Sequence, residues 1–150
     1  MITFICGVPC SGKTTYRQKH FPDVPCVDII EFQRHLKIRT KENVLRTYEQ
    51  TIEKTLEMAK DGDVIVEQTA LRQIRRLNAV KALRDGGYEG EIHLIFLAPS
   101  RMEIMGRAMN RFKDDDCTDQ QIVSYMDAHL DVLELPAQDE PFTSIKIIEE

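Results

Sequence analysis

The sequence lacks three features that would each place it in a familiar class of protein. No apolar run approaches the length of a membrane span, and the first residues enter a strand without a basic leader, so we expect neither anchor nor secretion signal. The four cysteines contain no C-x-x-C pair, which disfavours a zinc site and favours reduced thiols in a cytoplasmic protein. Positive charge is not in excess. The formal net charge of −5 gives an overall field that does not favour nucleic acid, although a local basic patch remains compatible with it.

What the sequence does contain is a phosphate-binding pattern near its start. Residues 7–14 read Gly-Val-Pro-Cys-Ser-Gly-Lys-Thr and match G-x-x-x-x-G-K-[ST] at every fixed position. The apolar run 2–6 precedes them as a candidate strand, and residues 13–20 can open a helix. A chance match in a chain of this length has odds of about one in a few hundred. The pattern therefore predicts a protein that binds a nucleoside triphosphate.

The residue types in this pattern suit the chemistry of phosphate binding. Gly7 and Gly12 permit positive φ, so successive backbone N–H groups can surround an anion at a helix N-terminus. Lys13 is predicted to reach the β- and γ-phosphates and the Thr14 hydroxyl to bind Mg²⁺. A glycine turn with an exposed lysine is the weaker alternative. The residues predicted to bind ATP are Gly7, Pro9, Cys10, Ser11, Gly12, Lys13, Thr14 and Thr15. The thiol of Cys10 is either activated by the loop or, as we favour, a small filler.

The rest of the chain alternates between strand and helix patterns. Further strands are expected at 26–28, 64–66, 91–97 and 144–148, and helices at 29–37, 41–60, 71–85, 101–112 and 118–134. Alternation of this kind predicts an α/β protein whose parallel sheet has helices on both faces, in three layers. No repeat or low-complexity tract interrupts the 150 residues, which fit one domain.

Two of these helices carry patterns that make specific predictions about burial. Helix 41–60 has an apolar stripe, which predicts core packing and consists of Val44, Tyr48, Ile52 and Leu56. In helix 71–85 the residues predicted to point inward are Ile74, Leu77, Val80 and Leu83. The five basic residues expected to be more exposed are Arg72, Arg75, Arg76, Lys81 and Arg84. A basic face is usually only solvated, but Arg72 and Arg75 begin close to the expected ligand edge.

Polar residues follow the second and third strands, at the edge where open parallel sheets bind ligands. Asp28 is expected either to accept a proton from an attacking hydroxyl or support Mg²⁺, or to cap the helix at Ile29, and the residues alone leave these open. Glu67 is predicted to hold Mg²⁺ through water. Gln68 or Thr69 is predicted to contact substrate or nucleotide, with capping of the next helix as the alternative for Thr69.

Two arginines on one helix suggest a lid. Arg107 and Arg111 are four residues apart, so they share a face of the helix that follows the fourth strand. In a phosphate-loop protein this position suits guanidinium groups that close over the triphosphate and stabilise charge in the transition state. The pair therefore favours phosphoryl transfer over simple nucleotide binding.

In their order, these motifs resemble the small P-loop kinases, zeta-toxin-like kinases among them, and most closely the kinase domain of polynucleotide 5′-hydroxyl kinases. The resemblance covers nearly the whole chain. It rests on 7–16, on Asp28-Ile29-Ile30-Glu31, on 64–71 followed by Arg75-Arg76, on 107–111 and on Tyr125-Met126. It implies a P-loop NTPase fold with five parallel strands in the order 2-3-1-4-5, a helical lid, and use of ATP and Mg²⁺.

The resemblance also implies roles for individual residues. Asp28 corresponds to the general base, Lys13 and Thr14 to the phosphate and Mg²⁺ contacts, Arg111 with Arg107 to the lid, and Thr69 to an acceptor contact. Two positions depart from the family pattern. Gln68 stands where family members often have Asp, and Glu31 stands where they place an acceptor-binding Arg. Arg34 or Arg72 is the expected substitute for that missing arginine.

The sequence thus predicts an ATP-dependent kinase that transfers the γ-phosphoryl group to a hydroxyl. Two acceptors compete. The whole-chain resemblance favours a nucleic-acid 5′ end, whereas the acidic charge and the missing arginine favour a small molecule or nucleoside. A third interpretation is a nucleotide-binding regulatory module with little phosphoryl transfer. Oligomeric state and base preference are left open by the sequence.

Overall fold

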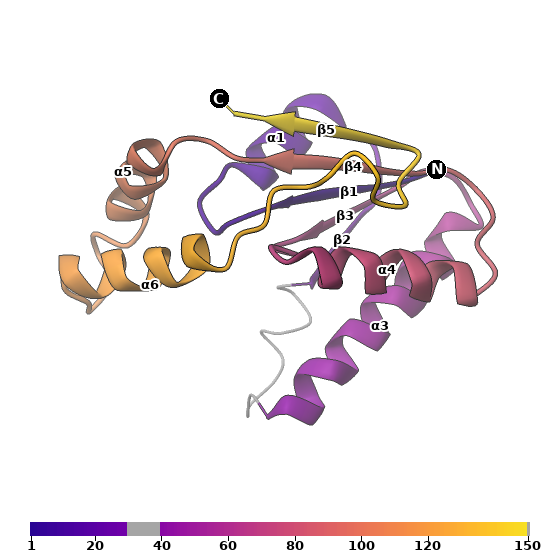
Figure 1. Cartoon of the computed structure of the whole chain (residues 1–150), viewed down its shortest axis with the longest axis horizontal. Coiled ribbons are helices and arrows are strands. Elements are labelled where there is room, and N and C mark those ends of the chain that lie inside the picture. Colours follow the sequence, from indigo (N-terminus) through magenta and orange to yellow (C-terminus); the bar gives the residue numbers. More distant parts are fainter. Residues whose placement is uncertain (30–39, 150) are drawn as a thin grey trace.

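The computed structural model describes residues 1–29 and 40–149, and its centre is a parallel sheet (Figure 1). The five strands are β1 (Ile2–Gly7), β2 (Cys26–Asp28), β3 (Val64–Gln68), β4 (Ile92–Leu97) and β5 (Ser144–Ile148). Every pairing between neighbours is parallel and the order is β2-β3-β1-β4-β5. This confirms the predicted fold class and strand order. Because all strands run the same way, their carboxyl ends meet at one edge of the sheet.

Helices cover both faces of this sheet. They are α1 (Lys13–His20), α3 (Lys41–Ala59), α4 (Gln73–Asp85), α5 (Arg101–Arg111) and α6 (Asp119–Asp131). In Figure 1, α1 lies on one side, α3 and α4 lie on the other, and α5 and α6 form a pair beyond the carboxyl ends of the strands. Ser100 and Thr118 begin α5 and α6 with capping boxes, which satisfy the first backbone N–H groups of each helix. Among the described helices, none is sufficiently long and apolar to span a bilayer.

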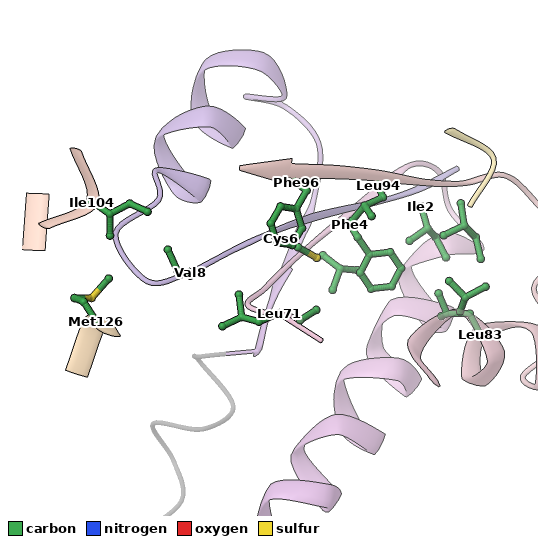
Figure 2. Close-up of a cluster of buried hydrophobic side chains, with 14 of the residues drawn as sticks. Ile2, Phe4, Cys6, Val8, Leu71, Leu83, Leu94, Phe96, Ile104 and Met126 are labelled. Atoms are coloured by element: carbon green, nitrogen blue, oxygen red, sulfur yellow. The ribbon is translucent and has the colours of Figure 1, made fainter. Parts of the chain in front are cut away.

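Strand β1 is buried along its whole length because β3 and β4 flank it and helices cover it. Its side chains alternate between two cores. Ile2, Phe4 and Cys6 belong to the larger core, which β4, α4, α5 and α6 complete (Figure 2). Ile5 belongs to the smaller core, against which Tyr16 of α1 packs. The apolar run at the start of the sequence is therefore the centre of the molecule, and it delivers the phosphate-binding pattern to the carboxyl edge.

Helix α3 does not bury the face that its apolar stripe predicts. Its fully buried side chains are Thr47, Thr51 and Thr55, whereas the predicted stripe is half-buried. Each threonine hydroxyl donates to the carbonyl four residues earlier, at 2.9, 2.9 and 2.7 Å, so no polar group is left unsatisfied by the burial. Ile52 and Leu56 still pack against the larger core. Tyr48 and Ile52 of the stripe border a cavity.

Helix α4 corrects a second prediction, because an arginine and not an isoleucine faces inward. Ile74 is 56% exposed, whereas Arg76 is 1% exposed. The Arg76 guanidinium donates to both carboxylate oxygens of Glu140 at 2.8 Å and to the carbonyls of Ala70 and Leu71 at 2.9 and 3.1 Å. This complete set of partners explains how a charged side chain can lie in the core.

Candidate active site

The phosphate-binding pattern forms a tight loop between β1 and α1, and its two glycines are required by the backbone. Gly7 has φ 152°, and a Cβ there would lie 2.6 Å from Ser11 Oγ and 2.7 Å from the carbonyl oxygen of Leu97. Gly12 has φ 96° and is the N-cap of α1. Both positions therefore need glycine, the first because a side chain has no room and the second because of its left-handed backbone.

Lys13 is the first residue of α1 and its side chain folds back over the loop. It is only 8% exposed, and its Nζ donates to the carbonyl oxygens of Gly7 and Val8, both at 2.9 Å. Burial lowers the pKa of the Lys13 ammonium, and the nearby carboxylates of Glu67 and Asp28 oppose that shift. A buried cation of this kind is available to anionic oxygens placed against the loop.

Carboxylates from two neighbouring strands lie beside the loop. The Thr14 hydroxyl donates to Glu67 Oε2 at 2.9 Å, and Glu67 Oε1 accepts from Arg17 Nε. Asp28 pairs with Glu67 in the register of β2 and β3, and its charge acts on Lys13 and Arg17. The structure thus brings together Lys13, Thr14, Asp28 and Glu67. Sequence reasoning missed Arg17, although its spacing of three from Thr14 on α1 places both on one face.

Of the two arginines predicted to form a lid, Arg107 contacts the loop, although α5 lies far along the chain. Arg107 Nη1 donates to the carbonyl oxygen of Ser11 at 3.0 Å. The positive charges of Arg111, Lys13 and Arg107 all act on the Cys10 thiol. Burial nevertheless raises the pKa of Cys10 above its usual value, so an activated thiol is not supported.

The residues predicted to contact the acceptor are distributed less tightly. Gln68 is buried at the carboxyl end of β3, beside its register partner Cys6 of β1. Thr69 is half-buried and its carbonyl accepts from the backbone N–H of Gly7 at 3.2 Å. It does not cap α4, because the N-cap of that helix is Arg72, which is exposed. Arg34 lies outside the described residues.

The loop and its neighbours fit a nucleotide with a bound magnesium ion. Ser11 Oγ is buried and has no hydrogen-bond partner among the described residues, in a loop whose lysine is also buried. The Thr14 hydroxyl and the Glu67 carboxylate offer the hard oxygen ligands that Mg²⁺ takes. Within residues 1–29 and 40–149, no three His, Cys, Asp or Glu side chains form a metal cluster, so phosphate and water oxygens would complete such a site.

Comparisons with known proteins agree with this geometry. A family model described as an AAA domain matches residues 2–133. No curated protein matches the chain in sequence. Among solved structures, the fold is similar to a sugar kinase from Janibacter sp. HTCC2649, with 18% identity, a TM-score of 0.64, and coverage of 99% of this chain and 84% of that one.

Two further solved structures share the fold. A gluconokinase from Sinorhizobium meliloti 1021 has 17% identity and a TM-score of 0.63, over 99% of this chain and 82% of that one. A chain of the Pnkp1/Rnl/Hen1 RNA repair complex has 13% identity and a TM-score of 0.66, over 89% of this chain and 46% of that one. At these identities the likeness shows a common fold.

Proposed function

The chain belongs to the AAA domain family, and from this premise we propose that it is an ATP-dependent kinase that phosphorylates a hydroxyl group. One observation carries the proposal. A buried lysine, a threonine–carboxylate pair and a lid arginine come from separate elements and converge on one glycine loop. The likeness of the fold to a sugar kinase and a gluconokinase supports the same reaction class.

In this mechanism the loop binds the triphosphate. Backbone N–H groups of Val8 and of residues 10–13 surround the phosphates, and Lys13 exchanges its two carbonyl acceptors for phosphate oxygens. Thr14 would hold a bound Mg²⁺ directly and Glu67 would hold it through water, and the ion would supply positive charge to the transferring phosphoryl group.

Asp28 acts on the acceptor. The hydroxyl oxygen attacks the γ-phosphorus, its proton passes to the Asp28 carboxylate, and the bond to the β–γ bridging oxygen breaks to release ADP. Arg107 and Arg111 stabilise the charge that develops on the phosphoryl oxygens. Thr69 contacts the acceptor, together with Gln68, Arg72 and Arg34, of which the last lies outside the described residues.

The test is phosphoryl transfer from labelled ATP to a panel of hydroxyl acceptors. Asp28→Asn is expected to lower turnover about 10²-fold or more while ATP affinity is retained, because the amide cannot accept the proton. Asp23→Asn is the matched control, since Asp23 is an exposed aspartate just before β2 and is expected to behave as wild type. Equal turnover in Asp28→Asn removes Asp28 as the base, and ATP binding without transfer to any acceptor supports a regulatory module instead.

We propose a small molecule as the acceptor, because the net charge of −5 disfavours a polyanion. The likeness to a chain of an RNA repair complex keeps a nucleic-acid 5′ end as the second candidate. Ionic strength separates the two, since oligonucleotide binding weakens steeply with salt and binding of a neutral alcohol does not. A steep salt dependence of acceptor KM would favour the 5′ end.

We also propose that residues 1–150 act as one kinase domain in the cytoplasm. All five strands belong to one sheet, and the four cysteines are free thiols, as expected of a reducing compartment. Labelling of the native protein with a thiol reagent, followed by mass measurement, tests whether the cysteines are reduced, as a cytoplasmic location requires. Disulfides in protein isolated under conditions that trap thiols would contradict it.

A further inference from the structure

A cavity of 390 Å³ lies between α3, α4 and the sheet, which is within the size range of small-molecule sites. It exists because α3 turns its threonines, and not its apolar stripe, toward the core. Its walls are mostly apolar and come from the sheet, from α3 and from α4, represented by Phe4, Val66, Tyr48, Ile52, Ala79 and Ala82. Nothing in the phosphoryl-donor site uses this space.

The cavity reaches the carboxyl edge of the sheet. Gln68 and Ala70 line it at the carboxyl end of β3, on the face opposite to that of Glu67, because neighbouring side chains of a strand alternate between the two faces. A molecule in the cavity would therefore have one end at the edge of the sheet that carries the loop. The other end would lie between α3 and α4, where the Arg75 guanidinium sits over the Tyr48 ring at 5.5 Å from its centroid.

The buried part of the lining offers few partners to a polyol. Its polar residues are Thr51 and Gln68, and the Thr51 hydroxyl already donates to the carbonyl of Thr47. The other polar residues of the described lining are exposed, and they are Glu49, Glu53, Arg75 and Asn78. Most hydroxyls of an open-chain sugar placed against the buried walls would lose water without gaining an equivalent partner. A flat apolar ring loses little on entering, and it gains contact with the Tyr48 ring and the aliphatic walls.

Charge at the rim also restricts the ligand. Glu49 and Glu53 are exposed on α3 and line the cavity, whereas Arg75 is the cation of the described lining. Two carboxylates against one guanidinium disfavour an anionic acceptor such as a sugar acid. An uncharged ring is compatible with both signs.

We propose that this cavity binds the non-reacting part of the acceptor, and that the acceptor is an uncharged alcohol carrying a flat, largely apolar ring. The inference rests on the proposed kinase activity and goes beyond it by excluding open-chain polyols and sugar acids, although a gluconokinase shares the fold. The hydroxyl lies at the Gln68 end, and the ring lies against Tyr48 between the two helices.

The experiment uses the full chain with four probes: benzyl alcohol and 2-phenylethanol as ring-bearing alcohols, and ribitol and gluconate as open-chain acceptors. Each is tested for phosphorylation with labelled ATP, and separately for binding by saturation-transfer NMR. Ala79→Leu fills the cavity, Tyr48→Ala removes an aromatic wall, and Lys81→Leu places a leucine on the exposed side of α4 as the matched control.

We expect lower KM for the ring-bearing alcohols, a rise of about tenfold or more in that KM for Ala79→Leu and Tyr48→Ala, and no rise for Lys81→Leu. ATP affinity, measured in parallel, reports whether each variant is folded. Preferred phosphorylation of ribitol or gluconate, or a ring-acceptor KM that neither cavity variant changes, overturns the inference and leaves the kinase assignment intact. If no probe is phosphorylated, the NMR result still decides: absence of ring binding, or ring binding that survives both cavity variants, refutes the cavity assignment.

Discussion

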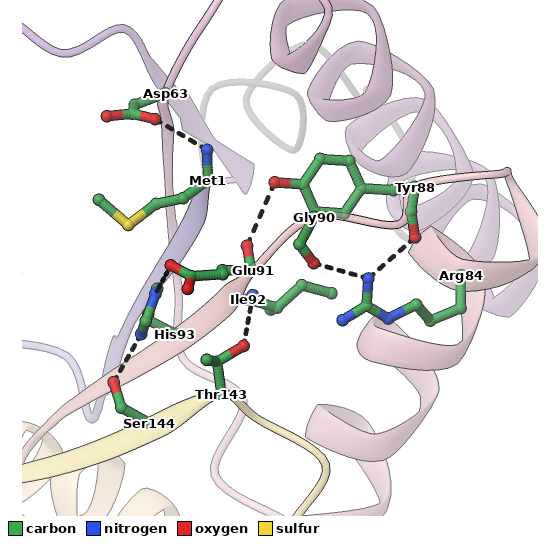
Figure 3. Close-up of polar contacts among 10 residues, drawn as sticks. All are labelled: Met1, Asp63, Arg84, Tyr88, Gly90, Glu91, Ile92, His93, Thr143 and Ser144. Carbon is green, nitrogen blue, oxygen red and sulfur yellow. Dashed lines mark hydrogen bonds and ion pairs between the residues drawn. The ribbon is translucent and has the colours of Figure 1, made fainter.

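The two edges of the sheet use similar polar residues in different ways. At the amino edge, the polar groups drawn in Figure 3 bind partners on neighbouring segments: the Met1 ammonium pairs with Asp63 at 2.7 Å, and Arg84 donates to the carbonyls of Tyr88 and Gly90 at 2.9 and 2.7 Å. At the carboxyl edge, Lys13 is buried against carbonyls alone, and Ser11 Oγ has no described partner. The polar contacts at the amino edge stabilise the fold, whereas polar groups at the carboxyl edge are available to a ligand.

A histidine at the amino edge illustrates why placement decides function. His93 joins Ser144 at 2.6 Å and Glu91 at 3.0 Å through its two ring nitrogens, so a serine, a histidine and a carboxylate form a chain (Figure 3). The same three residue types act as a hydrolytic triad elsewhere. Here they tie β4 to β5 at the edge opposite to that where parallel sheets bind ligands. Residue types alone therefore do not identify a site.

The largest effect is expected from a polar pair that contradicts a simple division between the edges. Arg76 and Glu140 are wholly buried, and Arg76 also holds the strand-end carbonyls of Ala70 and Leu71. Arg76→Met leaves the Glu140 carboxylate buried without its partner, which should lower the free energy of unfolding by about 3–5 kcal/mol in urea denaturation. Lys81→Met removes the partner of an exposed pair and should change it by less than about 1 kcal/mol.

The double variant Arg76→Met with Glu140→Leu distinguishes a lost attraction from a stranded charge. An apolar pair of similar volume removes both buried charges, so most of the lost stability should return. If the double variant is as unstable as Arg76→Met, the hydrogen bonds to the strand-end carbonyls are what stabilise the fold, and the carboxyl edge depends on Arg76 directly.

The second effect concerns Lys13, which should matter for turnover more than for folding. Lys13→Met removes the cation proposed to contact the phosphates and should lower kcat by about 10²–10³. Burial holds the pKa of Lys13 in the folded protein below its ordinary value of 10.5, so between the folded-state pKa and 10.5 the unfolded chain binds more protons. Wild-type stability should therefore rise, relative to Lys13→Met, as the pH increases through that window.

Urea unfolding across alkaline pH measures this difference, and Lys19→Met, which alters an exposed lysine of the same helix, is the control. Normal turnover in Lys13→Met would mean that Lys13, like the polar residues of the amino edge, has only a structural role. A constant stability difference at every pH would mean that its ammonium titrates as in the unfolded chain.

The fold and the loop are predictable from sequence because their determinants are local. Residues 7–14 constrain one another within eight positions, and an apolar run followed by Asp28 or Glu67 marks the carboxyl end of a strand. These signals predicted the strands and the loop, whereas the strand order came from the resemblance to the small P-loop kinases. The catalytic and binding roles of the individual residues stay predictions.

What sequence reasoning missed depends on contacts between distant segments. Nothing near Arg76 shows that Glu140, 64 residues later, will pair with it in the core. Nor does the pattern of α3 show that Thr51 will be buried, because its hydroxyl is satisfied within the helix and so behaves as apolar. The burial of Arg76 was missed because its partner is distant in sequence, and the burial of Thr51 was missed because an apolar pattern does not register a hydroxyl that is satisfied within its own helix.

A smaller effect is expected at the amino edge from Arg84→Ala. The change removes two hydrogen bonds to carbonyls and a contact with the Tyr88 ring at 5.8 Å, all at an exposed position. We expect a loss of about 1 kcal/mol in the free energy of unfolding and wild-type kcat and KM. Lower turnover at unchanged stability would contradict the division of labour between the edges.

The smallest effect is expected from Asp63→Asn, which breaks the ion pair with the Met1 ammonium. The two side chains are 45% and 55% exposed, so solvent screens their attraction and the loss should be about 0.2–1 kcal/mol, shrinking further as salt is added. Turnover should equal that of wild type.

The comparison with Asp28→Asn is direct, because both substitutions replace one carboxylate at the end of the sheet by an amide. If both reduced turnover equally, position at the carboxyl edge would have no special value. A large effect confined to Asp28→Asn would show that the same chemical change matters only where strands deliver a carboxylate to the loop.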